Sequence, residues 1–203
     1  KNGRNGIYTF SEDGDSVRLN LQASWGYGRE GELLLEFEYN KEVIMRLPFT
    51  ILPLNELGFK NEGMGLYIGA IQGELGADVK IKQATKTLDR IPPSVILVNA
   101  VQGISEAWGI SKIVAVSNGC HVFSSYKKSL AKRVKSNFDG IFKNLGAKDM
   151  SEMKHWILPI KWEQKDETDI PSKKRSSYRR KVTLRKNVHM NVCNAVKNLC
   201  QPG

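Results

Sequence analysis

The sequence predicts an α+β fold, in which a mixed, largely antiparallel sheet carries helices packed on it. Apolar and polar residues alternate with period two through the first third of the chain, as they do in the strands of hairpins. Two later runs, at 66–72 and 113–117, are almost continuously apolar, as in buried strands. Between and after these runs, several segments carry apolar residues at helical spacing. Hairpins followed by strands interspersed with helices indicate a mixed sheet rather than a doubly wound one.

Residues 1–60 are expected to form antiparallel hairpins. Val17, Leu19 and Leu21 alternate with polar neighbours, which predicts a strand with one wet face. Turn-forming residues separate this strand from its neighbours. The expected strands cover residues 6–10, 17–21, 33–39 and 43–47, and prolines 48 and 53 mark the exit from this region.

Residues 61–165 are expected to hold the core strands and most of the helices. After the strand at 66–72, Asp78 can cap a short helix that ends near Leu88. Pro93 suits the first turn of a second helix, which is expected to stop at Gly109. The second helix is apolar around most of its circumference, so it should be well buried.

The remaining elements include one further core strand, at 113–117. An amphipathic helix at 125–145 and a strand at 156–162 follow, and the proline inside the latter favours an edge or a bulge. Residues 170–200 are expected to form a long basic helix with Ser172 as its cap. A chain of 203 residues is long enough to bury a hydrophobic core, so residues 1–203 are expected to form a single domain.

Positive charge is concentrated at the C-terminal end of the chain. The whole chain has 31 basic and 21 acidic residues and a formal net charge of +10. Residues 170–203 hold nine of the basic residues and no Asp or Glu, so the rest holds 22 against 21 and is nearly neutral. Such a segment favours contact with phosphate or other anionic groups. The residues expected to bind the anion are Lys173, Lys174, Arg175, Arg179 and Arg180.

Other uses of this basic helix stay open. It can be a solvated helix docked on the body of the protein, or it can contact an acidic protein partner. Tyr178, Val182, Arg185 and His189 lie at helical spacing and offer a packing stripe. Sequence-specific recognition of nucleic acid is not expected, because no zinc-finger, RNP-like or helix-turn-helix pattern is present. Contact with an anionic membrane surface also stays open.

Composition narrows the class of protein further. No apolar run approaches the roughly 20 residues that span a bilayer, so no transmembrane segment is expected. The odd number of cysteines, three, favours a reducing compartment and a cytoplasmic location. The histidines and cysteines lack the paired spacing of metal ligands, so no metal site is expected.

A glycine-rich turn after the strand at 66–72 is a candidate cofactor site. Gln72, Gly73, Gly76 and Ala77 lead into a helix, and such a turn can present backbone N–H groups to an anion. The turn is similar to the one that binds the pyrophosphate of acyl-CoA in the GCN5-related acyltransferase fold. Here the motif is out of register, and two helices instead of one separate the core strands. The alternative is that these glycines only allow a tight turn.

His121 is the candidate general base, and Asn118 is counted with the cofactor-binding residues. Both follow the core strand at 113–117, where loops present side chains to a cleft. An unperturbed histidine titrates near neutrality, which suits proton transfer. The alternative is a structural histidine held by hydrogen bonds.

Three stretches resemble the VirK/YbjX family of Gram-negative bacteria, also known as DUF535. They are 67–73 (YIGAIQG), 115–118 (AVSN, with His121 following) and 172–180 (SKKRSSYRR). The resemblance covers most of the chain from about residue 66 onward. It implies a setting in virulence or envelope stress. A peripheral position on the inner membrane stays open beside the expected cytoplasmic location. The resemblance implies no particular reaction.

Two functional hypotheses follow. The first is an acyltransferase that uses acyl-CoA or acyl carrier protein as donor, with the basic helix lining a site built on residues 69–77 and His121. The second is a non-enzymatic module that binds an anionic membrane, lipopolysaccharide or nucleic acid through its basic helix. A splay between the strands at 66–72 and 113–117 favours the enzyme, and a continuous sheet favours the module.

Overall fold

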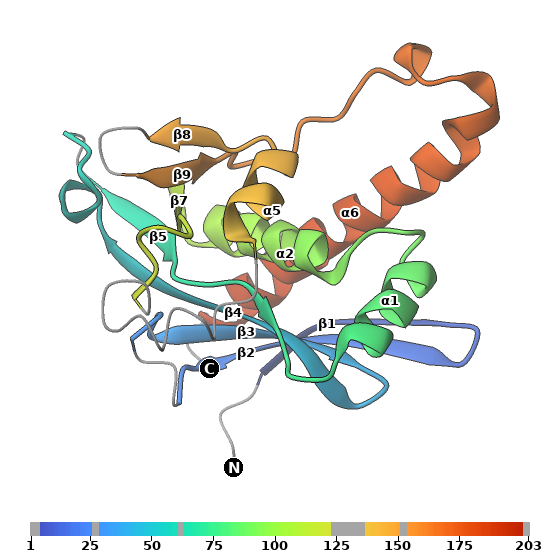
Figure 1. Cartoon of the computed structure of the whole chain (residues 1–203), viewed down its shortest axis with the longest axis horizontal. Helices are drawn as coiled ribbons and strands as arrows, with labels where there is room; N and C mark the ends of the chain where they lie inside the picture. Colours follow the sequence, from blue (N-terminus) through green and yellow to red (C-terminus); the bar gives the residue numbers. More distant parts are fainter. Residues whose placement is uncertain (1–4, 26–28, 61–62, 123–136, 151–153, 201–203) are drawn as a thin grey trace.

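A mixed and mostly antiparallel sheet organises the molecule. The computed structural model describes residues 5–25, 29–60, 63–122, 137–150 and 154–200. In this part of the chain the strands follow the order β1-β2-β3-β4-β5-β7-β9-β8, and β6 pairs with β4 (Figure 1). Only the pairing of β5 with β7 is parallel among the described strands. The predicted α+β class with a mixed, largely antiparallel sheet is therefore confirmed.

The N-terminal hairpins contain the four predicted strands. They are β1 (Asn5–Glu12), β2 (Asp15–Ala23), β3 (Leu33–Tyr39) and β4 (Glu42–Pro53). The prediction that β4 ends before Pro48 is wrong. Pro48 lies opposite Leu34 of β3, and its carbonyl accepts a hydrogen bond from the Gly69 amide at 3.1 Å. Proline lacks only the N–H donor, so its carbonyl can still take part in pairing.

The later strands are shorter than predicted. They are β5 (Met64–Ile68), β6 (Gln72–Gly73), β7 (Lys112–Val116), β8 (Lys148–Met150) and β9 (His155–Leu158). The strand predicted at 66–72 breaks after Ile68. At Gly69 the backbone passes so close to Glu30 that an added Cβ would lie 1.7 Å from the Glu30 carbonyl oxygen. The strand predicted at 156–162 ends before Pro159, whose carbonyl accepts a hydrogen bond from Gln102 instead.

Four α-helices and two 3₁₀ turns accompany the sheet in the described residues. They are α1 (Asp78–Thr87), α2 (Pro93–Ala107), α5 (Phe138–Asn144), α6 (Ser172–Leu199), η1 (Leu54–Leu57) and η2 (Glu167–Asp169). Asp78 and Ser172 were predicted as caps, but each is the first helical residue, and no side-chain cap bond is made there. Much of the helix predicted at 125–145 lies outside the described residues, and α5 is its last part.

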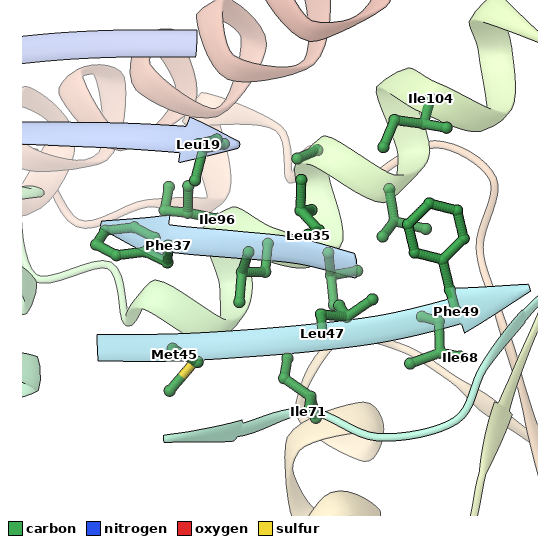
Figure 2. Close-up of a cluster of buried hydrophobic side chains, with 14 of the residues drawn as sticks. Leu19, Leu35, Phe37, Met45, Leu47, Phe49, Ile68, Ile71, Ile96 and Ile104 are labelled. Carbon is green, nitrogen blue, oxygen red and sulfur yellow. The ribbon is translucent and has the colours of Figure 1, made fainter. Parts of the chain in front are cut away.

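Helix α2 packs over β3 and β4, and α6 lies beside it and also contacts β1. The inward side chains of the sheet, such as Phe37 and Phe49, pack in one cluster with Ile96 and Ile104 of α2 (Figure 2). On its other side, α2 contacts α6, which buries Val188, Val192 and Val196, among others. Both helices that later define the candidate site are therefore fixed by the hydrophobic core.

The α2–α6 contact depends on a glycine. A Cβ at Gly103 would lie 2.6 Å from the carbonyl oxygen of His189, so any side chain would push the two helix backbones apart. We expect Gly103→Ala to lower the free energy of unfolding by about 1–3 kcal/mol, the usual range for overpacking. Urea denaturation monitored by circular dichroism measures this loss. An unchanged unfolding midpoint would contradict the close contact.

Candidate functional site

The predicted cofactor turn is tied to the sheet by its own backbone. Gln72 and Gly73 pair with Arg46 and Met45 of β4. The Glu74 amide donates to the Ile44 carbonyl at 2.9 Å, and the Ala77 amide donates to the Glu74 carbonyl at 3.1 Å. Gly76 has φ +79°, a conformation that favours glycine. These contacts give the turn a structural role, and its binding of an acyl donor stays a prediction.

The turn also carries a negative charge. The Glu74 carboxylate forms an ion pair with Arg46, and Arg46 Nε lies 3.1 Å from Glu36 Oε1. The guanidinium nearest to the turn is thus already shared between two carboxylates. That arrangement does not favour a pyrophosphate beside it.

His121 is buried in the structure rather than facing a cleft. Its Nε2 lies 3.1 Å from Glu30 Oε1, and the carboxylate of Glu30 is buried as well. The imidazole ring packs on Phe138, with ring centroids 5.2 Å apart. This environment fits the structural alternative for His121 better than a base that meets a substrate from solvent. The catalytic role remains untested.

Asn118 joins the end of β7 to the start of α5. Its Oδ1 accepts a hydrogen bond from the Phe138 amide at 2.8 Å, and its own amide donates to Asp139 Oδ1 at 3.1 Å. The same Asp139 oxygen accepts from Trp156 Nε1 at 2.7 Å. Asn118 therefore acts here as a bridge between elements. The cavities lined by Arg185, by Arg180 and by Asp15 do not include Asn118, His121 or the turn at 72–77.

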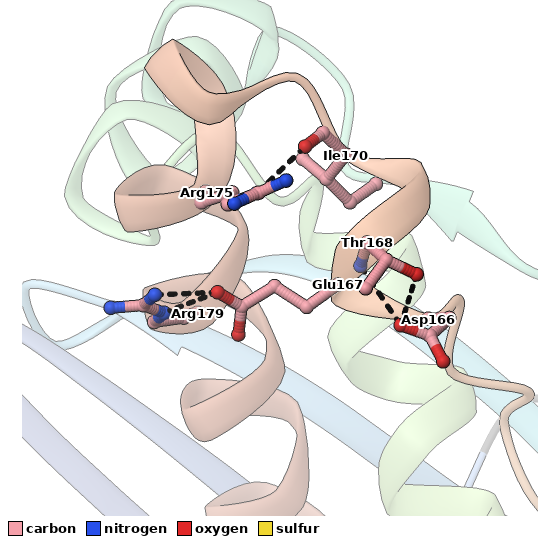
Figure 3. A network of polar contacts seen from close by, with 6 residues as sticks. All are labelled: Asp166, Glu167, Thr168, Ile170, Arg175 and Arg179. Atoms are coloured by element: carbon pink, nitrogen blue, oxygen red, sulfur yellow. Dashed lines mark hydrogen bonds and ion pairs between the residues drawn. The ribbon is translucent and has the colours of Figure 1, made fainter.

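Three of the five predicted anion-binding residues instead fasten α6 to its surroundings. Arg175 Nε donates to the Ile170 carbonyl at 2.9 Å, and Arg179 Nε donates to Glu167 Oε1 at 2.9 Å (Figure 3). Arg180 Nε lies 3.1 Å from Asp89 Oδ1. Lys173 and Lys174, in contrast, are exposed on the first turn of α6. The arginines thus order the basic end of the helix, and their binding of an external anion stays a prediction.

Arg185 lines a cavity between α2, α6 and the segment after β9. Its Nε donates to Asn99 Oδ1 at 2.7 Å, and its guanidinium lies over the Trp162 ring, 3.7 Å from the centroid. Asn99 Nδ2 donates to Gln102 Oε1 at 2.8 Å, and Gln102 Nε2 donates to the Pro159 carbonyl at 2.8 Å. Asn99 and Gln102 are both buried. A buried chain of amides therefore holds the guanidinium against the indole.

The guanidinium of Arg185 has no acidic partner in the described part of the chain. Its one hydrogen bond to another side chain there is the bond from Nε to Asn99, so the two terminal amino groups remain as donors. Burial lowers the pKa of Arg185 to about 10, so the group is still protonated at neutral pH. A half-buried cation held in place by neutral partners can accept an anion from solution.

The same cavity is lined by the carboxylate of Glu106, which contacts two nitrogen atoms. His189 Nε2 lies 3.0 Å from Glu106 Oε2, and Lys161 Nζ lies 3.4 Å from the same oxygen. The hydrogen bond with His189, followed by the contact with Lys161, lowers the pKa of Glu106, so this carboxyl is ionised at neutral pH. The cavity has a volume of about 290 Å³, and Gln164, Lys186 and Met190 also line it.

Sequence reasoning did not identify this site. It placed Arg185 and His189 on one packing stripe of the basic helix with Tyr178 and Val182. Val182 is indeed buried, but the later part of the stripe lines a cavity. The partners of Arg185 come from residues 86 and 23 positions away in the sequence, Asn99 and Trp162, so no local signal joins them.

No described helix is both long and apolar enough to cross a bilayer. Among the same residues, no group of three or more His, Cys, Asp or Glu side chains could hold a metal ion.

Comparison with known proteins places the chain in a family. Two proteins of Haemophilus influenzae are each 28% identical to it, over 175 and 169 residues, which are 84% and 76% of this chain. The Escherichia coli protein YbjX is 24% identical over 176 residues, or 85% of this chain. The matches cover 55%, 56% and 52% of these relatives, so the chain spans about half their length. No solved structure matches. The model of the family DUF535, described as a protein of unknown function, matches residues 4–194, and the chain therefore belongs to that family.

Proposed function

We propose that the protein binds a small organic anion, a phosphate or a carboxylate, in the cavity at Arg185. The observation that carries the proposal is the state of the Arg185 guanidinium. It is half-buried, stacked on Trp162 and hydrogen-bonded to Asn99, and it forms no ion pair with a carboxylate of the described residues. Burying a charge is costly, and a bound anion would offset that cost. The cavity opens to solvent between two helices that the core holds rigidly, which suits a preformed ligand site.

The acyltransferase hypothesis has less support. β5 and β7 pair over residues 65–68 and 112–115 without a gap, so the described strands form a continuous sheet where a splay was expected of the enzyme. Two amides of the predicted donor turn bond within the protein, and Glu74 adds negative charge there. A cavity of about 290 Å³ is also at the low end of the range for ligand sites, which favours a ligand smaller than acyl-CoA.

Binding of a large polyanion through the basic helix is the second hypothesis, and it also has less support. Arg175, Arg179 and Arg180 each contact the protein itself. Exposed ion pairs of this kind contribute little to stability, so they can exchange for phosphate contacts. Lys173 and Lys174 are the better test of that surface, since both are exposed and neither side chain forms an ion pair or hydrogen bond with the described residues.

Isothermal titration with inorganic phosphate, benzoate and phenyl phosphate tests the Arg185 site. We expect at least one of them to bind, and Arg185→Gln to weaken its binding at least tenfold, because a charge-assisted hydrogen bond contributes about 1.5–3 kcal/mol. Lys197→Gln is the matched control, since it removes the same charge from an exposed position of α6 outside the cavity. Thermal unfolding should show that both variants are folded.

Two outcomes would contradict the proposal. One is that none of the three anions binds the folded wild-type protein. The other is that Arg185→Gln and Lys197→Gln bind them equally well. Titration with acetyl-CoA in parallel tests the acyltransferase hypothesis, and binding of acetyl-CoA that is unaffected by Arg185→Gln would favour that hypothesis instead.

A further inference from the structure

We infer that the Arg185 cavity selects a phosphate monoester in its dianionic form, with the organic part of the ligand lying against Met190 and Trp162. This inference rests on the proposed function, because it names the class of anion that the same site takes. Three features of the cavity carry it: its charge, the orientation of the guanidinium and the apolar part of its lining.

The charge of the lining matches a dianion. Lys161, Arg185 and Lys186 face a single carboxylate, Glu106, so the cavity has an excess of two positive charges when His189 is neutral. A carboxylate or a sulfate monoester would neutralise half of this excess, and a phosphate monoester above its second pKa would neutralise all of it. Complementary charge of this kind raises both affinity and the rate of association.

The guanidinium of Arg185 is oriented to bind a tetrahedral oxyanion. The Nε of Arg185 is hydrogen-bonded to Asn99, and the Trp162 ring covers one face of the guanidinium. The edge with the two terminal amino groups is therefore the part that can bind a ligand. Arginine binds phosphate through two parallel N–H···O bonds, in a geometry that lysine cannot copy. The hydrogen bond from Nε to a buried amide fixes the direction of this edge before any ligand arrives.

Part of the lining of the Arg185 cavity is apolar and exposed to solvent. Met190 is 54% exposed although it lines the cavity, and Trp162 forms the adjacent wall. Methionine adapts its shape to a ligand and makes favourable contacts with aromatic rings. An organic group attached to the phosphate would cover this surface, so we expect a phosphate ester to bind more tightly than inorganic phosphate.

A neighbouring cavity of about 250 Å³ shares Arg185 and Trp162 but is less suited to a dianion. Lys165 and Arg185 face Glu163 there, so its excess is a single positive charge. A zwitterion whose ammonium group contacts Glu106 is the competing ligand for the first cavity. Since Lys161 and His189 already contact Glu106, we favour the dianion.

Phenyl phosphate and phenyl sulfate are matched probes, because they share their shape and differ by one negative charge at pH 8. We expect phenyl phosphate to bind about five- to tenfold more tightly, since one added charge contact near the surface contributes about 1 kcal/mol or slightly more. Inorganic phosphate should bind more weakly than phenyl phosphate. Glu106→Gln should tighten the binding of phenyl phosphate several-fold, and Met190→Ala should weaken it without affecting inorganic phosphate.

The outcomes separate this inference from the proposed function. If phenyl phosphate and phenyl sulfate bind equally well and Arg185→Gln weakens both, the preference for a dianion is wrong. The proposed anion site at Arg185 would still stand. Weaker binding of phenyl phosphate by Glu106→Gln would also overturn the preference for a dianion. Failure of every probe to bind the folded protein would remove both the inference and the proposed function.

Discussion

Replacing His121 by alanine should destabilise the protein by about 3–5 kcal/mol, because it removes a fully buried ring and the neighbour of a buried carboxylate. His121 Nε2 lies 3.1 Å from Glu30 Oε1, and both side chains are buried. No hydrogen bond to either oxygen of the Glu30 carboxylate is present among the described residues, so the nearby imidazole is the counterpart that the structure gives it. The substitution would therefore leave a carboxylate in the interior without its one described counterpart, in addition to a cavity beside Phe138.

Urea denaturation of His121→Ala, Glu30→Gln and the double variant measures this coupling. If the two side chains stabilise each other, the double variant should lose clearly less stability than the two single losses added together. Additive losses would show that the pair is not coupled. A folded His121→Ala protein that binds phenyl phosphate like the wild type would also separate His121 from the Arg185 site.

Substitution of Gly69 by alanine should have an effect of similar size, or should prevent folding. A Cβ at this position would lie 1.7 Å from the carbonyl oxygen of Glu30, and both atoms are attached to the backbone. No rotamer change can relieve such an overlap, so either β5 or the loop that carries Glu30 must move. The His121–Glu30 pair would be disturbed at the same time.

Gly119→Ala is the matched control for this prediction. Gly119 is exposed, and a Cβ added there would have the Ser117 hydroxyl oxygen as its nearest neighbour, at 4.0 Å, so we expect a change within about 0.5 kcal/mol. The measurement is the thermal unfolding midpoint of both purified variants. A Gly69→Ala protein as stable as Gly119→Ala would contradict the close approach of the two backbones.

The sequence was sufficient for elements whose signals are local. Alternation at Val17, Leu19 and Leu21 predicted β2, and Pro93 with an apolar helical pattern predicted α2. The close approach of the Glu30 carbonyl to Gly69, just after the strand ends at Ile68, was not predictable, because Glu30 comes from a distant loop. Periodicity describes the strand itself and carries no information on what approaches its backbone.

The candidate site was hardest to predict for a related reason. The sequence shows that residues 170–203 are basic, but it does not show which cations are already paired. Arg179 meets Glu167 and Arg180 meets Asp89, whereas Arg185 meets only neutral partners. Pairing of this kind depends on how α6 lies on α2, and that packing is set by apolar residues and by Gly103. Charge counting alone therefore favoured the first turns of the helix as a binding surface and gave no signal for Arg185.

The position of Arg185 on the last helix links occupancy of the site to the local stability of the C-terminal region. Arg185 and His189 reach the cavity only while α6 is docked on α2, so a ligand at that site binds the docked state alone. By mass action, a ligand at 100 times its Kd would stabilise the docked helix by about 2.7 kcal/mol. Amide hydrogen exchange in α2 and α6 would then slow by roughly a hundredfold where it proceeds through undocking of α6.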